Sequence, residues 1–270
     1  MKLSCLPVSL YKDLTQGVIS LTGWLDFAAK LGLDGADMSV AHLQKTTTKD
    51  RHRLRQYAAD LGLQIAMVVT YTDFTHPDDF ERAKQIDDLL VHIDMAAELG
   101  ASYLRVTAGQ AHPTVSRSDG VRWAVEGLQA CLSQATEANL TLTYENHTIG
   151  YGWTHVDFSQ PADIFCDIVA FTEGSGLKIL FDTANNLARN DDPLTVLERV
   201  IDRVAVLHVS DIEQAGQFNP VVVGTGIAPI PDIFSAMKAV NFDGWISLEE
   251  ASKTGESGFQ NGVNYIRKVW

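Results

Sequence analysis

AAKLGLDGADM (28–38) recurs, with small changes, as AADLGLQIAMV (58–68) and as AAELGASYLRV (96–106). In each copy a helical segment closes on Leu-Gly, and an apolar, strand-like run follows within a few residues. Glycine readily takes the left-handed conformation that ends a helix, so this spacing is typical of a helix that leads directly into a strand. The repeated pattern predicts a chain of alternating helices and strands.

The alternation continues along all 270 residues, without a long linker or a low-complexity segment. Periodicity predicts strands at 3–8, 33–39, 63–70, 102–107, 140–145, 177–182, 204–209 and 244–249. It predicts helices at 20–31, 48–61, 77–99, 116–138, 159–173, 192–202, 229–240 and 256–268. Eight such units predict an α/β protein, a single (β/α)8 TIM barrel that forms one domain over residues 1–270. A doubly wound open sheet is the alternative, which the number of units and the lack of GxGxxG after the first strand disfavour.

Composition and charge narrow the class of protein. Apolar residues make up 46% of the chain, but no apolar run approaches the roughly 18 residues that span a bilayer, and the N-terminal segment predicts no secretory signal. The formal net charge of −13 disfavours nucleic acid, anionic membranes and an anionic substrate. Cys5, Cys131 and Cys166 form no CxxC pair and predict core thiols in a reducing compartment. We therefore expect a cytoplasmic enzyme that acts on small molecules.

Each of the last four expected strands ends in a residue that can bind a metal ion. These residues are Glu145 in LTYENH, Asp182 in LKILFDTAN, His208 in VAVLHVSD and Glu249 in GWISLEEAS. In a parallel barrel the carboxyl ends of the strands meet at one mouth, where active sites are placed. Any one of these residues could instead be a helix cap, a satisfied histidine or a surface acid, but four in register favour a shared site. An oxygen-rich set with one imidazole suits Mn²⁺, Mg²⁺ or Co²⁺ better than structural zinc.

The alternation of side chains along each strand supports this arrangement. If the four residues point into the barrel, the residue before each one faces the covering helices. Those preceding residues are Tyr144, Phe181, Leu207 and Leu248. All four are apolar or aromatic, as a helix-covered face requires. Asn146 has the opposite parity to Glu145, so we expect it to turn the chain.

These residues resemble the metal ligands of the sugar phosphate isomerase/epimerase family. Its members have xylose-isomerase-like barrels and include ketose 3-epimerases, hydroxypyruvate isomerase and inosose dehydratase. The resemblance covers the element order of essentially the whole chain and is most specific from residue 140 onward. It implies one divalent metal ion, in the first place Mn²⁺ with Mg²⁺, Co²⁺ or Zn²⁺ as alternatives, held by Glu145, Asp182, His208 and Glu249. The segment VVVGTGIAPI (221–230) resembles the family's glycine-containing loop and offers a weak hint of a phosphate cradle.

The resemblance also implies a reaction class, with Glu145 and Glu249 as catalytic acid and base. A metal-stabilised enediolate, formed by proton abstraction next to a carbonyl, can lead to epimerisation, isomerisation or loss of a β-hydroxyl. We expect a divalent-metal-dependent isomerase or epimerase of a sugar or sugar phosphate. The alternative is a metal-dependent lyase that dehydrates a keto-inositol or keto-sugar. Asn185 stands where ketose epimerases tend to carry histidine, and the loop HTIGYGWTH lacks their second acid, which leaves the substrate open.

Four residues near the expected mouth are candidates for substrate binding: Arg105, His147, Asn185 and Asp211. Arg105 has inward parity on the fourth strand, so it could orient Glu145, bind a substrate oxygen or form a structural ion pair. His147 could contact substrate or be an exposed loop residue. Asp211 could orient His208, bind a second metal ion or cap a turn.

Other residues and other classes of function carry weaker signals. His76 and His112 follow the third and fourth strands, and their place before proline is typical of a helix cap. Trp24 and Trp153 could wall a pocket or pack in the core. An apurinic-site endonuclease shares this barrel but needs more clustered histidines and a basic groove. A non-catalytic sugar-binding module has no use for four ligands in register. The resemblance alone implies a homo-oligomer.

Overall fold

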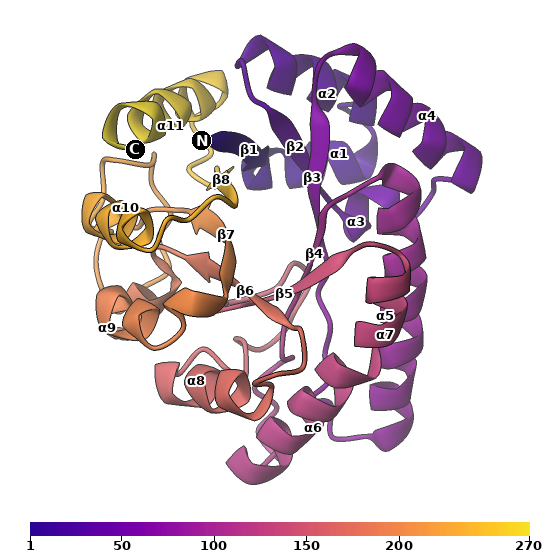
Figure 1. Ribbon diagram of the computed structural model, residues 1–270, viewed down its shortest axis with the longest axis vertical. Coiled ribbons are helices and arrows are strands. Elements are labelled where there is room, and N and C mark those ends of the chain that lie inside the picture. Colours follow the sequence, from indigo (N-terminus) through magenta and orange to yellow (C-terminus); the bar gives the residue numbers. More distant parts are fainter.

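The computed structural model describes residues 1–270 and confirms the predicted TIM barrel (Figure 1). Eight parallel strands form one sheet in the order β1-β8-β7-β6-β5-β4-β3-β2, and helices cover its outer face. The strands are β1 (Lys2–Leu6), β2 (Gly35–Ser39), β3 (Gln64–Val69), β4 (Tyr103–Val106), β5 (Thr141–Glu145), β6 (Lys178–Asp182), β7 (Val204–Val209) and β8 (Trp245–Glu249). Seven of the strands fall within their predicted ranges, and β1 begins one residue before the predicted range 3–8.

The covering helices also follow the predicted order. They are α2 (Leu21–Lys30), α4 (Thr48–Asp60), α5 (Asp79–Leu99), α6 (Arg117–Ala130), α7 (Leu132–Glu137), α8 (Ala162–Phe171), α9 (Pro193–Glu198), α10 (Ile230–Ala239) and α11 (Glu256–Val269). The predicted helix 116–138 is divided at Cys131 into α6 and α7. None of the helices is both long and apolar enough to cross a membrane.

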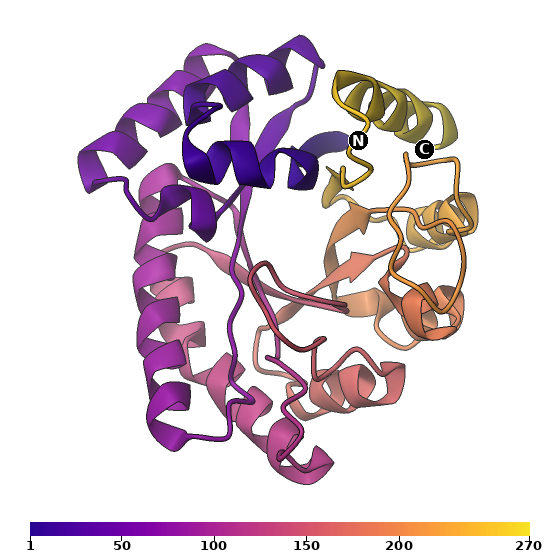
Figure 2. The same ribbon diagram turned by 180° about the vertical axis from the view of Figure 1, so that it is seen from behind.

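Short helical segments that periodicity did not predict lie in the loops. They are η1 (Val8–Leu10), α1 (Tyr11–Gln16), α3 (Val40–Leu43), η2 (Asn185–Arg189) and η3 (Ile201–Arg203). The predicted strand 3–8 stops at Leu6, before Pro7, because proline has no N–H to donate to a ladder. Segments of three to six residues are too short for a 3.6-residue period to be visible in sequence. Four of the five, η1, α1, α3 and η2, follow strand ends and lie at the mouth of the barrel (Figure 2).

The Leu-Gly joints are built as their sequence predicts. Gly32, Gly62 and Gly100 have φ of 68°, 76° and 70°, in the left-handed region that glycine adopts without strain. At the end of α5, the Gly100 N–H donates to the Ala97 carbonyl oxygen over 2.9 Å. Each joint ends a helix within four residues of the next strand, which keeps neighbouring units in step around the barrel.

The barrel closes between β1 and β2 through contacts other than a regular ladder. The Asp34 N–H donates to the Leu3 carbonyl oxygen over 2.9 Å, and the Leu3 N–H donates to Asp34 Oδ2 over 2.8 Å. Inside the barrel, the hydroxyls of Ser4 and Ser247 both donate to Asp37 Oδ2. Burial raises the pKa of Asp37 to about 6, although these hydroxyls oppose the rise. A buried carboxylate thus joins β1, β2 and β8 where the sheet meets itself.

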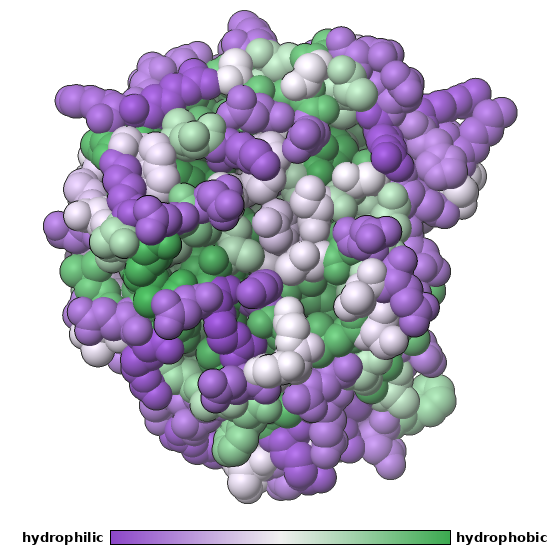
Figure 3. Space-filling view, in the orientation of Figure 1, coloured by the Kyte–Doolittle hydropathy of each residue, from purple (hydrophilic) through white to green (hydrophobic).

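The main apolar core lies between the sheet and the helices. The residues that precede the four candidate ligands, Tyr144, Phe181, Leu207 and Leu248, are fully buried there, which confirms the alternation inferred from sequence. The ring of Tyr144 packs 5.1 Å from that of Phe165 on α8. Polar and charged side chains cover most of the periphery, with apolar patches between them (Figure 3). The strands therefore have an apolar outer face and can carry polar residues inside the mouth.

We predict that Gly35→Ala destabilises the barrel by about 1–3 kcal/mol, because overpacking a tight site forces its neighbours to move. An added Cβ would lie 2.8 Å from the Gln64 carbonyl oxygen and from the Trp245 ring. Gly23→Ala is the matched control, since its Cβ would meet only Ser20 Oγ at 3.2 Å and Ile19 at 3.7 Å. Urea denaturation measures both variants. Equal midpoints for the two would show that the packing around Gly35 is looser than described.

Candidate metal centre

The four predicted ligands converge at the carboxyl ends of β5 to β8. One ligand atom from each of Glu145, Asp182, His208 and Glu249 lies within 4.8 Å of all the others. Asp182 and His208 are paired in register on β6 and β7, which fixes their relative height. Glu145, Asp182 and His208 are essentially inaccessible to solvent, whereas the side chain of Glu249 is 17% exposed. Only Glu249 therefore opens appreciably to solvent.

His208 lies between the two glutamates. Its Nδ1 is 2.8 Å from Glu145 Oε1 and 2.9 Å from Glu249 Oε2. Nδ1, rather than Nε2, is therefore the ring nitrogen that faces the acids. The two carboxylates that the resemblance implicates in acid–base chemistry approach the same point from different strands, β5 and β8.

Asp182 is held by groups that are not ligands. Its Oδ1 accepts hydrogen bonds from the N–H of Ala184 at 2.9 Å and of Asn185 at 2.7 Å. The Ser210 hydroxyl lies 2.8 Å from both carboxylate oxygens. These donors fix the orientation of Asp182, so its position in the cluster does not depend on the other ligands.

Burial and mutual proximity shift the pKa values of three ligands. Burial, with repulsion from Glu249 and Glu145, raises the pKa of Asp182 to about 8. Burial also opposes the charged form of Glu145, but attraction to Arg105 and His208 outweighs it and lowers that pKa to about 2. For His208, burial disfavours the cation, yet Glu145 and Glu249 raise its pKa to about 10. The metal-free cluster is thus held together by the positive charges of Arg105 and His208 and by a proton on Asp182.

The donor set fits a divalent cation. Glu145 Oε2 and His208 Nε2 are buried without a hydrogen-bond partner. Once Asp182 and His208 lose their protons, three carboxylates share a space in which Arg105 supplies the one nearby positive charge. Buried charges of like sign are costly unless a cation is bound between them. Oxygen donors with a single imidazole suit Mn²⁺, Mg²⁺ or Co²⁺, and Zn²⁺ also accepts such ligands.

Asn146 has a structural role that sequence reasoning missed. Its Oδ1 accepts from the Asp182 N–H at 2.7 Å, and its Nδ2 donates to the Asp182 carbonyl oxygen at 3.0 Å and to Asn186 Oδ1 at 2.8 Å. The amide therefore clamps the end of β6 to the end of β5, whereas we expected Asn146 only to turn the chain. Its opposite parity to Glu145 was the available signal, because an amide of that parity faces away from the metal ligands and toward the neighbouring strand end.

A cavity of about 570 Å³ adjoins the cluster. Glu249 and two of the predicted substrate-binding residues, Arg105 and His147, line it. Its other walls include Tyr11, Tyr71, Tyr151, Phe218 and Lys253. The loop that follows β5 runs across this end of the barrel (Figure 2) and contributes His147 and Tyr151. His147 Nδ1 is 3.3 Å from Asp157 Oδ2, and its ring packs 5.7 Å from that of Trp153.

The other two predicted substrate-binding residues, Asn185 and Asp211, do not line this cavity. Asn185 Oδ1 accepts a hydrogen bond from the Thr148 hydroxyl at 2.7 Å. The carboxylate of Asp211 accepts four backbone hydrogen bonds of 2.8–3.0 Å, from residues 212, 224, 226 and 228. Asp211 thus orders the glycine-containing loop from within.

The weaker candidates lie outside the cluster. His112 Nε2 is 2.8 Å from Asp73 Oδ2, and its ring packs against His76 at 4.9 Å and against His155 at 5.6 Å. This second polar group joins the loops after β3, β4 and β5. Trp24 is buried in the core, where its ring packs against Phe259.

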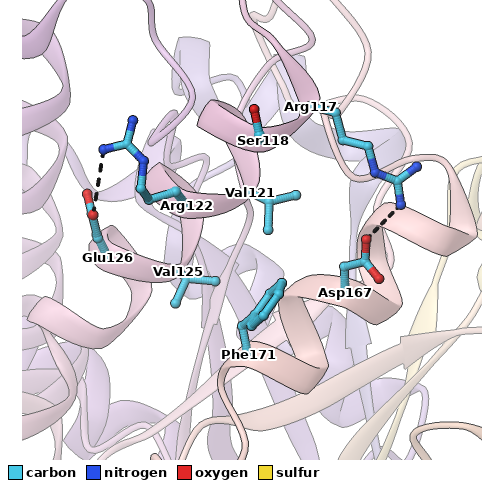
Figure 4. Close-up of a pocket in the computed structure, with 8 residues that line it drawn as sticks. All are labelled: Arg117, Ser118, Val121, Arg122, Val125, Glu126, Asp167 and Phe171. Atoms are coloured by element: carbon cyan, nitrogen blue, oxygen red, sulfur yellow. Dashed lines mark hydrogen bonds and ion pairs between the residues drawn. The ribbon is translucent and has the colours of Figure 1, made fainter.

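A larger hollow lies on the outside of the barrel and is not the metal centre. It measures about 800 Å³, and its lining residues come only from α6 and α8 (Figure 4). Arg117 pairs with Asp167 across it, and Phe171 and Val125 form its apolar floor. No residue of the metal cluster reaches this groove.

An eight-stranded barrel with an acid–histidine cluster at the carboxyl ends of its strands defines a class of small-molecule enzymes. The chain belongs to the xylose isomerase-like TIM barrel family, whose model matches residues 25–269. Inosose dehydratase of Clostridium beijerinckii is 24% identical over 250 residues, which are 79% of this chain and 80% of that protein. Inosose dehydratase of Lacticaseibacillus casei is 27% identical over 139 residues, and that match spans 46% of this chain and 44% of the relative.

Solved structures share the fold over the whole length. The probable 3-DHS dehydratase AsbF of Bacillus anthracis superposes with a TM-score of 0.80 at 18% identity, covering 99% of both chains. A D-psicose 3-epimerase gives 0.79 at 16% identity, covering 100% of this chain and 99% of the other. The IolI protein, described with a bound zinc atom, gives 0.79 at 16% identity, covering 100% and 98%. At these identities the likeness shows the fold alone.

We predict that metal binding near pH 7 releases close to two protons and strengthens as the pH rises toward 8. At pH 7 the metal-free protein holds a proton on Asp182, with its pKa of about 8, and on His208, with its pKa of about 10. Both must leave before the side chains can coordinate a cation. Calorimetric titration with Mn²⁺ in buffers of different ionisation enthalpy counts the protons. Asp182→Asn should lower the count by about one, and release near zero in the native protein would contradict the assignment.

We also predict that Asn146→Ala lowers the free energy of unfolding by about 1–3 kcal/mol, because it leaves the buried backbone of Asp182 unpaired. Metal affinity should fall by about 10- to 100-fold, as expected when a group that orients a ligand is lost. Asn261→Ala, at an exposed position on α11, is the control. Denaturation and metal titration of both variants give the comparison, and unchanged metal affinity in Asn146→Ala would refute the clamp.

Proposed function

We propose that the chain is a divalent-metal-dependent isomerase or epimerase of a sugar or sugar phosphate that abstracts a proton next to a carbonyl. Mn²⁺ is the proposed metal ion, and the cytoplasm the proposed location. The observation that carries the proposal is the placement of Glu145 and Glu249 on either side of His208 Nδ1, beside a cavity of sugar size. Membership of the family supports it, since relatives of this barrel include epimerases and dehydratases.

The ligands would hold the cation through carboxylate oxygens of Glu145, Asp182 and Glu249 and through the imidazole of His208. When bound, the cation polarises a carbonyl and stabilises the negative charge that develops as the neighbouring C–H proton leaves. Glu249 has the exposure to meet substrate, so we assign it the first proton transfer. Glu145, which Arg105 keeps ionised, is the second acid–base group and must take up a proton before it can donate one to the opposite face of the substrate. His147 and Arg105, which line the cavity, bind substrate oxygens.

A dehydratase of a keto-inositol or keto-sugar is the second candidate. Related proteins named inosose dehydratase favour it, one of them aligned over 79% of this chain. Ketose epimerases tend to carry histidine where this chain has Asn185. Asn185 binds Thr148 and does not line the cavity, so this difference does not prevent proton abstraction at the metal centre. Both reactions begin with the same step and differ in whether the β-hydroxyl then leaves.

NMR in D₂O separates the two candidates. The Mn²⁺-loaded protein is incubated with a ketose panel and with keto-inositol, and the metal is removed before spectra are recorded. Deuterium on the α-carbon without loss of water supports isomerisation or epimerisation. A product that has lost water supports dehydration. If neither occurs with any substrate and dialysed protein retains no divalent metal, the proposed function is wrong.

We predict that Glu145→Gln and Glu249→Gln each lower the exchange rate by about 10²–10⁴-fold, the usual contribution of a positioned acid or base. Each variant loses the proton acceptor but keeps the shape of the side chain. Glu173→Gln, an exposed substitution after α8, should leave the rate unchanged. Exchange followed by NMR at equal metal content gives the rates, and a rate in either site variant close to that of the control would contradict its assigned role.

A further inference from the structure

The Arg105 guanidinium lacks hydrogen-bond partners although it is buried. The side chain is 2% exposed and lines the cavity. Its Nε lies 3.3 Å from Glu145 Oε2 as an ion pair, but neither Nε nor Nη1 makes a hydrogen bond. A buried donor left without an acceptor is energetically unfavourable, so such groups call for an explanation. A ligand oxygen in the cavity supplies one.

The surroundings of Arg105 fix the direction of its fork. Tyr71 lies against the guanidinium, with its ring centroid 4.8 Å away, a cation–π contact. The hydroxyls of Tyr71 and Tyr11 are 2.9 Å apart and hydrogen-bonded to each other. Both tyrosines also line the cavity. The guanidinium is thus held from one side by Glu145 and from another by an aromatic wall.

Lys253 supplies a second positive charge at the same cavity. It has φ of 58°, a left-handed conformation that is unusual for lysine, and its N–H donates to Ser9 Oγ over 2.8 Å. Backbone in such a conformation often marks a functional site. Among the residues that line the cavity, Glu249 is the single acid, and it is already a candidate metal ligand.

Charge counting then points to the ligand. Three ligand carboxylates against one divalent cation leave one negative charge, which Arg105 balances. Among the side chains that line the cavity, Lys253 then carries the one positive charge that no lining acid balances. We propose that the substrate carries a carboxylate, bound by Arg105 and screened at the cavity rim by Lys253, in addition to the carbonyl and hydroxyl groups of the proposed reaction. This inference rests on the proposed function for its metal ion.

A phosphate is a poorer fit than a carboxylate. The glycine-containing loop that could have cradled a phosphate has its Gly224 and Gly226 N–H groups bonded to Asp211 at 3.0 Å and 2.8 Å. Those donors are not free for a ligand. A guanidinium binds two oxygens of a carboxylate or of a phosphate equally well, so the charge decides, and one excess positive charge matches the single negative charge of a carboxylate.

Equilibrium binding of shikimate and methyl shikimate tests the inference. The two probes share one hydroxylated ring and differ in the charge of a single group. The hydroxyls of shikimate are not on carbons adjacent to the one that bears the carboxylate, so a single metal ion does not readily chelate both. With Mn²⁺-loaded protein at low salt, we expect shikimate to bind about tenfold more tightly than its ester, as a charge-assisted contact predicts.

Substitutions assign that preference to residues. Arg105→Met should abolish the preference for the acid, since the ester cannot form the charged pair, and its metal content is measured beside it because Arg105 also pairs with Glu145. Lys253→Ala, on the exposed rim, should reduce the preference for shikimate over its ester about threefold. This variant keeps the test valid if Arg105→Met does not fold. Arg122→Met, on the outer surface of α6, is the matched control and should leave it unchanged.

The possible outcomes separate this inference from the proposed function. Equal affinity for acid and ester in the native protein overturns the carboxylate assignment, even if metal binding and exchange with neutral ketoses are intact. Competition by inorganic phosphate at least as strong as that by shikimate also overturns it. If Arg105→Met loses metal and ester binding together with the preference, while Lys253→Ala has no effect, Arg105 acts only by orienting Glu145. Absence of bound metal refutes the proposed function, whereas the charge preference can still be measured on the metal-free protein.

Discussion

The mutual repulsion of three carboxylates at the mouth, two of them buried and one partly exposed, is the constraint on which the rest of the site depends. Two like charges 4 Å apart repel by about 4 kcal/mol at an effective dielectric constant near 20. Glu145, Asp182 and Glu249 nevertheless share this space with His208. The cluster exists because Arg105 and His208 supply positive charge and because Asp182 holds a proton until a cation takes its place. The same charges therefore determine both how the site binds a cation and how stable the barrel mouth is.

Side chains that are not candidate metal ligands fix the positions of the strand ends that carry the ligands. Asn146 joins the ends of β5 and β6, and Ser210 on the segment after β7 reaches back to Asp182. The Thr183 hydroxyl donates to the Ser210 carbonyl oxygen and accepts from its N–H, so it locks that segment in turn. Because each strand end is bonded to the next, the ligands are preorganised by the sheet and do not need the cation to find their places.

The sequence predicted the features that follow from the repeated helix–strand units and from the alternation of side chains along each strand. The Leu-Gly joints, the eight units and the inward direction of Glu145 and its three partners all repeat or alternate, so they are visible without coordinates. The clamp by Asn146 and the loop-filling role of Asp211 are different, because each depends on which backbone groups meet in space. Sequence predicted four substrate-binding residues, and Arg105 and His147 line the cavity, whereas Asn185 and Asp211 bind their own surroundings. Spacing alone does not distinguish a side chain that faces a ligand from one that faces its own loop.

The net charge of the chain likewise does not reveal which charges line the cavity. The net charge of −13 disfavoured an anionic substrate, yet the cavity brings Arg105 and Lys253 together with a single acid. Surface acids are screened over a Debye length of about 8 Å at physiological salt, whereas buried groups interact through a medium of low dielectric constant. A ligand inside the mouth therefore responds to the few charges that line it. Asp211 already accepts from the N–H groups of the glycine-containing loop, whereas Arg105 lines the cavity with two donors that have no hydrogen-bond partner. The proposed carboxylate follows from that difference between two otherwise comparable anion sites.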